Sequence, residues 1–170
     1  MQGADDADVA IVEIGGTVGD IESQPFLEGI RQMGIELDPS DVVYIHLTLV
    51  PYMAATGEIK TKPTQHAVRS LHQVGVHPDI ILARAHHPID KKRKEKIAFN
   101  CSIKSQGVIS APDIESIYQV PVNLEKEKIG QVLLDTLKIN RKKREDKKWK
   151  EFWRKEQKAK KEVRIGIVGK

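Results

Sequence analysis

A glycine turn flanked by carboxylates is the first place in this chain where chemistry could occur. The turn GGTVG, residues 15–19, follows the apolar run 8–14, and Glu13, Asp20 and Glu22 flank it. Glycine backbones can direct several N–H groups at an anion, and Mg²⁺ prefers one or two carboxylates together with phosphate oxygens. The turn lacks the lysine of a Walker A loop, G-x-x-x-x-G-K-[ST]. Glu13 is therefore a candidate metal ligand, or else a strand-end glutamate that faces solvent or pairs with a lysine.

Each feature of this turn also has a purely structural interpretation. The glycines fit a tight strand-to-helix turn as well as an anion site. Asp20 and Glu22 could accept hydrogen bonds from a sugar or a base, but they also favour the positive end of a helix that begins near Ser23.

A second candidate site is the segment GEIKTKPTQH, residues 57–66. Two lysines, two threonines and a glutamine stand at an expected helix start, just past an expected strand. A helix N-terminus with flanking lysines suits a polyphosphate, and the amide of Gln65 offers the donor and acceptor that a base edge requires. The alternative is a chance juxtaposition of lysines with a helix that begins at a proline.

The six histidines predict no metal site. His66 and His72 do not share a helical face, while His86 and His87 are adjacent and would point to opposite sides of a strand. The single cysteine, Cys101, excludes an internal disulfide and a cysteine-based zinc site, and it fits a reducing compartment.

The elements that must position these residues alternate between strand-like and helix-like patterns. Strands are expected at 8–14, 42–50, 79–85 and 107–112. Helices are expected at 23–34, 63–75, 91–101 and 122–139. Near-continuous apolar strands separated by helices indicate an α/β fold with a parallel sheet that carries helices on both faces. Ligands of such sheets bind beyond the carboxyl ends of the strands, here in the loops 13–22, 51–65, 84–90 and 111–118.

The charge of the chain is unevenly distributed. The 170 residues carry a net charge of +4, yet residues 141–164 hold 13 Lys/Arg against 5 Asp/Glu, so the remaining 146 residues sum to −4. This basic stretch has a narrow apolar stripe of Trp149, Phe152 and Trp153. It predicts a linker helix that packs on its own domain rather than a nucleic-acid-binding tail. The run 163–170 predicts a terminal strand.

Composition also bears on localisation. The first residues lack the pattern of a signal peptide, and no apolar stretch approaches the roughly eighteen residues that a membrane span requires. We expect a cytoplasmic protein with no membrane partner.

Taken together, these segments resemble the synthetase (amidoligase) domain of the CTP synthase family. They are, in chain order, VEIGGTVGDIESQPFLEGIRQM, HLTLVPYMAATGEIKTKPTQH, GVHPDIILAR, KIAFNC and VISAPDIESIYQVPVNL. They cover most of residues 8–139, in family order and at family-like spacing. The ending VRIGIVGK resembles the first strand of the family's glutamine amidotransferase domain.

The resemblance implies a ligase of pyrimidine biosynthesis with a P-loop NTPase-like sheet of the dethiobiotin-synthetase type. In its reaction ATP phosphorylates the uracil 4-oxygen of UTP, and ammonia released from glutamine displaces the phosphate to give CTP. The implied cofactor is Mg²⁺, with ATP as a substrate. The implied assembly is a homotetramer in which the pyrimidine nucleotide binds between subunits.

Carried over residue by residue, the resemblance implies four sets of contacts. Glu13 corresponds to a Mg²⁺ ligand. The CTP-contacting segment is Asp20, Ile21 and Glu22. The UTP/CTP phosphate segment is Lys60, Thr61, Lys62, Pro63, Thr64 and Gln65, with Lys96 as a further contact. The ATP-facing residues are Arg84 and the adenine-holding segment Pro112, Asp113 and Ile114.

This chain also departs from the family pattern. Nothing in it corresponds to the family's Gly-Lys phosphate loop, its second Mg²⁺-binding aspartate or its glutaminase cysteine. RAHHP, residues 84–88, replaces a segment that usually carries an acidic residue and another arginine. We therefore expect an internal fragment that is inactive alone: residues 1–140 from the amidoligase domain, 141–162 a basic linker, and 163–170 the start of the amidotransferase domain. The alternative is a non-catalytic module that binds CTP or UTP.

Overall fold

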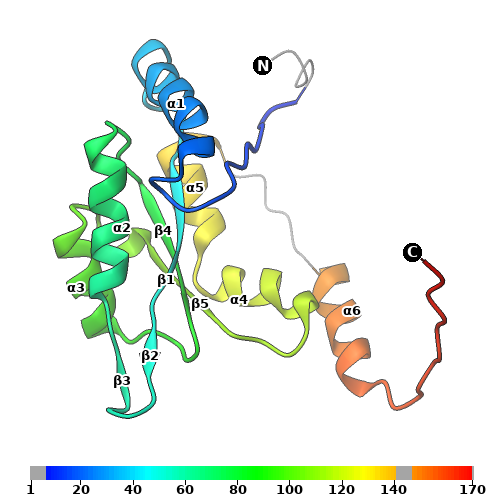
Figure 1. Cartoon of the computed structure of the whole chain (residues 1–170). Coiled ribbons are helices and arrows are strands. Elements are labelled where there is room, and N and C mark those ends of the chain that lie inside the picture. Colours follow the sequence, from blue (N-terminus) through cyan, green and yellow to red (C-terminus); the bar gives the residue numbers. More distant parts are fainter. Residues whose placement is uncertain (1–6, 141–146, 170) are drawn as a thin grey trace.

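The fold is built on an open parallel sheet. The computed structural model describes residues 7–140 and 147–169 (Figure 1). The strands β1 (Ile45–Leu49), β4 (Ile80–Ala85) and β5 (Val108–Pro112) are arranged in the order β1-β4-β5, and both pairings are parallel. A small antiparallel hairpin of β2 (Tyr52–Met53) and β3 (Glu58–Ile59) follows β1. The predicted α/β class is confirmed.

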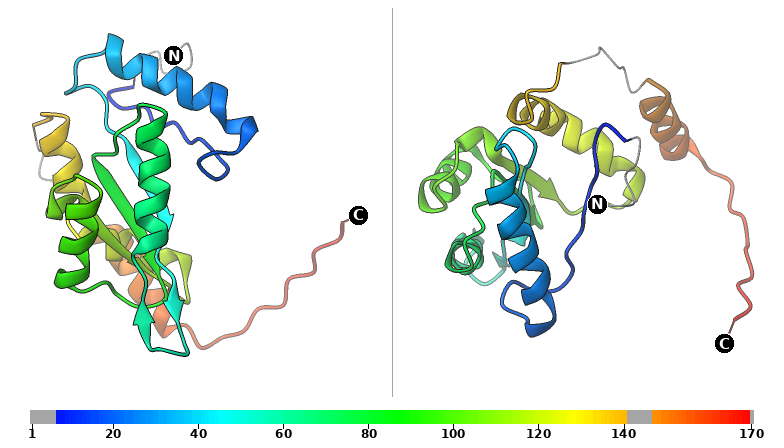
Figure 2. Two further views of the ribbon diagram at one scale, coloured as in Figure 1. Left: turned by 60° about the vertical axis from the view of Figure 1, so that its left-hand side comes forward. Right: turned by 90° about the horizontal axis from the view of Figure 1, so that it is seen from above.

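Helices flank the sheet. The α-helices of the described residues are α1 (Gln24–Glu36), α2 (Lys62–Gln73), α3 (Lys91–Asn100), α4 (Val120–Lys126), α5 (Ile129–Thr136) and α6 (Lys147–Lys158), of which α2 to α5 cover the sheet. Short 3₁₀ turns span Ile21–Ser23, Ser105–Gly107 and Ile117–Gln119. In Figures 1 and 2, α2 and α3 lie on one side of the sheet, and α4 and α5 lie on the other. Proline occupies the first turn of α1, α2 and α4, where its missing N–H costs no hydrogen bond.

The main core lies between the sheet and the pair α2–α3. Alternate residues of the central strand, Ile81, Ala83 and Ala85, pack there with Val68 of α2 and Ile97 of α3. Because β4 is covered on both faces, its apolar residues run almost without interruption, as expected for a parallel strand. A second cluster of Leu27, Leu71 and Val76 joins α1 to α2 and the segment after it.

Two expected strands are absent from the described residues. Residues 8–14 and 163–169 have no strand structure. The side chains of Ile11 and Val12 are 94% and 74% exposed. A strand forms only where another backbone satisfies its N–H and C=O groups. Within residues 7–140 and 147–169, β1 pairs only with β4, so neither run has a strand beside it.

The predicted single helix at 122–139 is also wrong, because two helices form there. α4 ends at Lys126, and α5 begins at Ile129. Lys128 between them has a left-handed backbone, φ 60°. The preceding residue, Glu127, turns towards β5 and accepts a hydrogen bond from the backbone of Ser110. Apolar periodicity continues through both helices, so the sequence pattern does not reveal this long-range contact.

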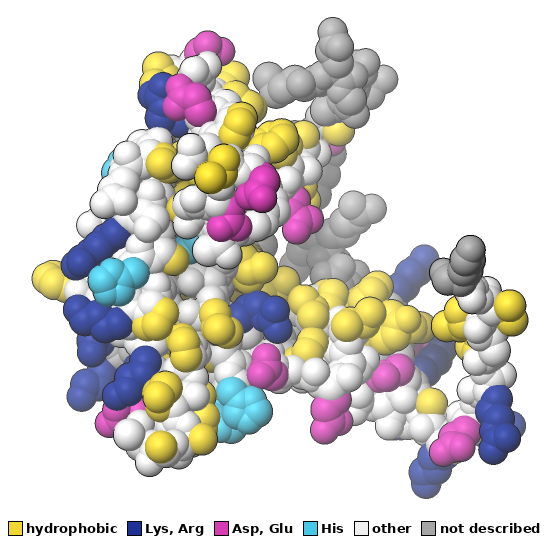
Figure 3. All heavy atoms as spheres, viewed as in Figure 1, with side chains coloured by type: hydrophobic (Ala, Val, Ile, Leu, Met, Phe, Trp, Pro, Cys, Tyr) yellow, Lys and Arg dark blue, Asp and Glu magenta, His cyan; other side chains and the backbone are white. Residues whose placement is uncertain are grey.

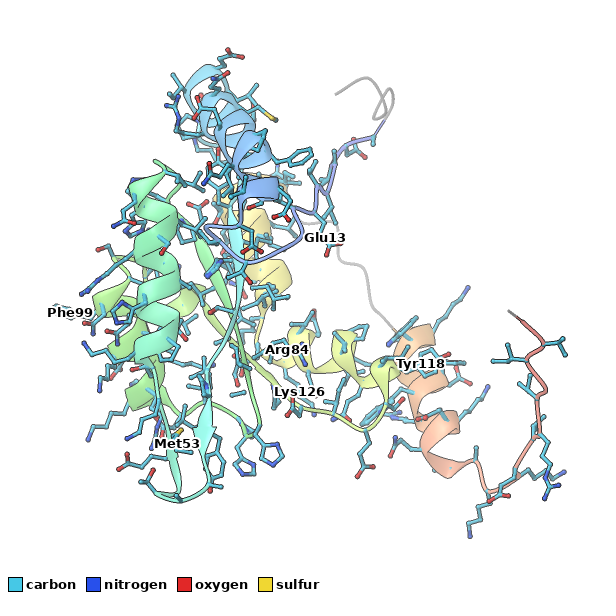
Figure 4. All side chains as sticks on the ribbon, in the orientation of Figure 1. Glu13, Met53, Arg84, Phe99, Tyr118 and Lys126 are labelled. Carbon is cyan, nitrogen blue, oxygen red and sulfur yellow. The ribbon has the colours of Figure 1, made fainter. Side chains whose placement is uncertain are left out.

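The basic helix α6 docks through its aromatic stripe. The indole N–H of Trp149 donates to the carbonyl oxygen of Tyr118 at 2.9 Å. The Phe152 ring meets the Tyr118 ring edge-on, with centroids 4.9 Å apart. Figure 4 labels Tyr118 where α6 approaches the turn before α4. The expected helix therefore forms and packs on the turn before α4, while its role as an interdomain linker stays a prediction. The residues 141–146 of the expected linker lie outside the described part of the chain.

None of the helices in the described part of the chain combines the length and the apolar character that crossing a membrane requires.

Candidate functional site

The glycine turn forms one wall of an acidic hollow. Glu13, Asp20 and Glu22 line a hollow of about 460 Å³ together with the first two glycines of the turn and Phe26. The structure therefore brings together three carboxylates that the sequence singled out. Figure 4 labels Glu13 on the extended segment that leads into this turn. Ile21, the middle residue of the predicted CTP segment, is exposed beside the hollow and does not line it.

Asp20 also holds the turn together. Its Oδ2 accepts a hydrogen bond from the backbone N–H of Thr17 at 2.7 Å, and its carbonyl oxygen accepts the Ser23 hydroxyl at 2.9 Å. Gly16 and Gly19 have φ angles of 87° and 107°, a region that residues with a side chain enter only with strain. A tight turn into the helix is therefore confirmed, but no strand precedes it in the described residues. The carboxylates of Glu13 and Glu22 lie at the surface of the hollow.

These carboxylates do not form a metal cage. No set of three or more His, Cys, Asp or Glu side chains in the described residues could hold a metal ion. Mg²⁺ commonly binds through one or two carboxylates while substrate phosphates and water complete its shell. Glu13 thus fits Mg²⁺ as one ligand among phosphate oxygens.

The segment 60–65 divides into exposed and buried residues. Thr61, Thr64 and Gln65 are buried, whereas the lysines and Pro63 are exposed at the start of α2. The Thr64 hydroxyl donates to the carbonyl oxygen of Leu49 at 3.1 Å. The Gln65 amide donates to the Thr61 hydroxyl at 3.1 Å, and its Oε1 has no hydrogen-bond partner among the described residues. Thr64 therefore anchors the helix start to the end of β1, and the bond between Gln65 and Thr61 stays within the start of α2.

The lysines belong to a larger cationic surface. The ammonium group of Lys60 pairs with the Glu58 carboxylate. That contact lowers the pKa of Glu58, and attraction to Lys60, Arg93 and Lys96 lowers it further. Lys96, predicted as a contact from the motif KIAFNC, thus lies within electrostatic range of the 58–62 segment. Figure 3 shows Lys and Arg side chains gathered along the side of the molecule formed by α2 and α3.

The predicted ATP-facing residues meet at the carboxyl ends of β4 and β5. In the parallel register Arg84 is opposite Ala111, and Ala85 is opposite Pro112. The guanidinium of Arg84 lies 3.8 Å from the Asp113 carboxylate, and the Asp113 backbone N–H donates to the Ala85 carbonyl at 2.9 Å. Figure 4 labels Arg84 at this edge of the sheet. Residues 27 positions or more apart in sequence are adjacent here because neighbouring parallel strands end together.

A histidine cluster at this edge was not predicted. His86 Nδ1 lies 3.2 Å from the second oxygen of Asp113. The His86 and His87 rings are 4.5 Å apart, and Tyr52 of the hairpin meets His87 edge-on at 5.1 Å. The expectation that the two rings point to opposite sides is wrong, because β4 ends at Ala85 and the histidines lie in the following bend. The one sequence feature that pointed to this cluster was RAHHP, residues 84–88, which replaces a segment usual in the family.

The candidate residues form three groups rather than one pocket. The acidic hollow is lined entirely by residues between 13 and 26. The cations lie just after β3, at the start of α2 and on α3, while Arg84 lies near the end of β4 and Asp113 follows β5. Sequence reasoning missed Arg93 and His86, which join their groups only through the fold.

The fold and these groups define the class of protein. An open parallel sheet with charged side chains beyond the carboxyl ends of its strands is an α/β domain arranged to bind ligands at that edge. The chain belongs to the CTP synthase family. The model of the family's N-terminal region, described as "CTP synthase N-terminus", matches residues 1–139.

Curated relatives support this assignment. The chain is 47% identical to the CTP synthase of Caldanaerobacter subterraneus subsp. tengcongensis, 48% identical to that of Koribacter versatilis and 47% identical to that of Methanocaldococcus jannaschii. The three matches cover 96%, 97% and 96% of this chain. The chain spans about 30% of the length of each relative.

Proposed function

We propose that this chain forms the pyrimidine-nucleotide-binding and ATP-facing part of a CTP synthase amidoligase domain. The observation that carries the proposal is the cationic surface at the start of α2. Lys60 and Lys62 flank a helix N-terminus, and Lys96 lies within electrostatic range of the same segment. Unpaired N–H groups and the helix dipole favour a phosphate there, and three lysines add the charge that a triphosphate requires.

Buried neighbours give this surface a fixed shape. Thr64 ties the first turn of α2 to the end of β1, and Gln65 bonds Thr61 within the start of the helix, so the flanking lysines extend from a fixed backbone. Pro63 fixes the backbone of the first turn. In this proposal the threonines and the glutamine position the backbone, and Lys60, Lys62 and Lys96 make the phosphate contacts.

The other two groups take the remaining roles. Arg84 and the segment Pro112–Ile114 face ATP, the latter holding the adenine through backbone groups. Asp20, Ile21 and Glu22 contact the product CTP as a feedback inhibitor. Glu13 binds Mg²⁺, which when present neutralises phosphate charge.

In the proposed reaction of the whole enzyme, the uracil 4-oxygen of UTP attacks the γ-phosphorus of ATP and ADP leaves. Ammonia from glutamine then adds at C4 of the uracil ring, the carbon that carries the phosphorylated oxygen. Phosphate departs with that oxygen, and CTP results. We propose that residues 1–140 belong to the amidoligase domain, 141–162 to the interdomain linker and 163–170 to the amidotransferase domain. The assembly proposed for the whole enzyme is a homotetramer with the nucleotide between subunits.

The 170-residue chain alone is expected to bind nucleotide without turning it over. Its sequence holds no Gly-Lys phosphate loop, so Glu13 and Arg84 would have to position ATP without a lysine on its β- and γ-phosphates. CTP formation from UTP, ATP and ammonia by the purified chain would contradict this expectation.

Calorimetric titration with CTP and UTP tests the binding proposal. Lys62→Gln should lower the affinity for both nucleotides about tenfold, because it removes one charge-assisted phosphate contact. Lys126→Gln is a matched control, since Lys126 ends α4 on the opposite side of the sheet (Figure 4). Absence of binding by the wild-type chain would contradict the proposed function.

Binding without turnover is also what the alternative, a non-catalytic nucleotide-binding module, predicts. Restored CTP synthesis on adding a separately expressed phosphate-loop segment would favour the enzyme.

A further inference from the structure

A fourth cation lies beside the lysines of the proposed nucleotide surface. Arg93 is in the first turn of α3, and Lys96 and Ile97 follow it by three and four positions. Residues at this spacing share one face of a helix. Ile97 is fully buried in the core cluster against which Ile59 of β3 packs. Arg93 and Lys96 therefore lie on the side of α3 that also carries Ile97 into the core cluster.

Glu58 directly precedes Ile59 on β3 and carries a carboxylate near these cations. Glu58 pairs with Lys60, and its carboxylate also attracts Arg93 and Lys96. Three cations therefore act on one carboxylate, and Asp90 pairs with Arg93, so these five side chains carry one positive charge in excess. A polyanion can neutralise that excess, whereas a neutral ligand cannot.

Arg93 keeps donors for such a ligand. The Asp90 carboxylate caps α3 by accepting a hydrogen bond from the Arg93 backbone N–H at 2.8 Å, and one guanidinium nitrogen of Arg93, Nη1, pairs with Asp90 Oδ2. A guanidinium has five N–H donors in a planar fork that matches phosphate oxygens. The side chain is 38% exposed, so ligand can reach it.

We propose that Arg93 binds the triphosphate of the pyrimidine nucleotide together with Lys60, Lys62 and Lys96. This inference rests on the proposed function, because the ligand is that of the same site. Arg93 contacts phosphate and not the base. Removal of the Arg93 side chain therefore lowers the affinities for inorganic tripolyphosphate and for CTP by the same factor.

Calorimetric titration of the whole chain with inorganic tripolyphosphate and with CTP tests the proposal. Arg93→Gln is expected to lower the affinity for both ligands about tenfold, because one charge-assisted contact is lost. Arg93→Lys keeps the charge without the fork and should recover part of the affinity. Lys92→Gln is the matched control, since it removes the same charge from the same helix. Lys92 is not among the groups that lower the pKa of Glu58, and its replacement should leave both affinities within about twofold.

The outcomes separate this inference from the proposed function. If the wild-type chain binds neither ligand, both are overturned. If it binds and Arg93→Gln has no effect, or Lys92→Gln weakens binding equally, the Arg93 assignment alone is wrong. Urea unfolding of each variant checks the fold. Should Arg93→Gln unfold the chain, unchanged affinity of Arg93→Lys for both ligands would overturn the assignment, and weaker binding would support it.

Discussion

Glu127 closes the outer edge of the sheet by accepting a hydrogen bond from the backbone N–H of Ser110 at 3.0 Å. The same carboxylate oxygen pairs with the ammonium group of Lys94 on α3. One side chain thus links β5, the junction of α4 with α5, and the helix on the other face of the sheet. Because exposed strand edges invite association, this contact protects β5 as well as stabilising it.

Replacing Glu127 by glutamine should destabilise the domain by about 1–3 kcal/mol, because the partly buried Lys94 loses its counter-charge. Urea denaturation measures the change. Glu125→Gln, an exposed change near the end of the preceding helix α4, should have an effect below about 0.5 kcal/mol. Equal stability of the two variants would show that Glu127 makes no net contribution.

The buried and exposed residues at the start of α2 should separate in experiment. Thr64→Val removes the hydroxyl that donates to Leu49 and should lower the free energy of unfolding by about 1 kcal/mol. It should leave the affinity for tripolyphosphate nearly unchanged. Lys62→Gln, two residues away, should weaken tripolyphosphate binding and leave the free energy of unfolding nearly unchanged. A large loss of binding in Thr64→Val without loss of stability would instead make Thr64 a direct ligand.

Stability should fall as the pH is lowered from about 7.5 to 5.5. Burial lowers the pKa of His46 below its ordinary value, and burial together with His77 lowers the pKa of His72. The unfolded chain therefore takes up protons at these residues before the folded chain does. Their stabilising contribution is full above the unfolded pKa near 6.5 and is lost as the pH falls towards the folded values.

Thermal unfolding of His46→Leu tests the larger part of this effect. The variant should show a shallower pH dependence, because it lacks a titrating group that is largely buried on β1. His66→Leu replaces an exposed histidine and serves as the control. An unchanged slope in His46→Leu would exclude His46 as a source of the pH dependence.

Docking of α6 should depend on its aromatic contacts. Trp149→Ala removes both the indole N–H that donates to the Tyr118 carbonyl and the contact of the indole with the Tyr118 ring. We expect faster amide exchange in Lys147–Lys158, because a charged helix of twelve residues is marginal without packing. Phe99→Ala, at an 87% exposed position on α3, should not alter exchange there. Slow exchange retained in Trp149→Ala would mean that other contacts hold α6.

The sequence alone determined the alternation of elements and the position of most helices and strands. Local features set these: buried β-branched runs in β4 and β5, and a proline in the first turn of α1 and α2. The family motifs likewise marked the lysines at 60 and 62. Such signals act over a few residues, so a single chain segment carries them completely.

Only the tertiary structure decided which candidates are exposed and which of them lie together. It buried Thr64 and Gln65, placed Arg93 near Glu58, and joined His86 to Asp113. It also left residues 8–14 outside the sheet. Strand pairing and burial depend on partners distant in sequence, and no local pattern specifies whether such a partner is present.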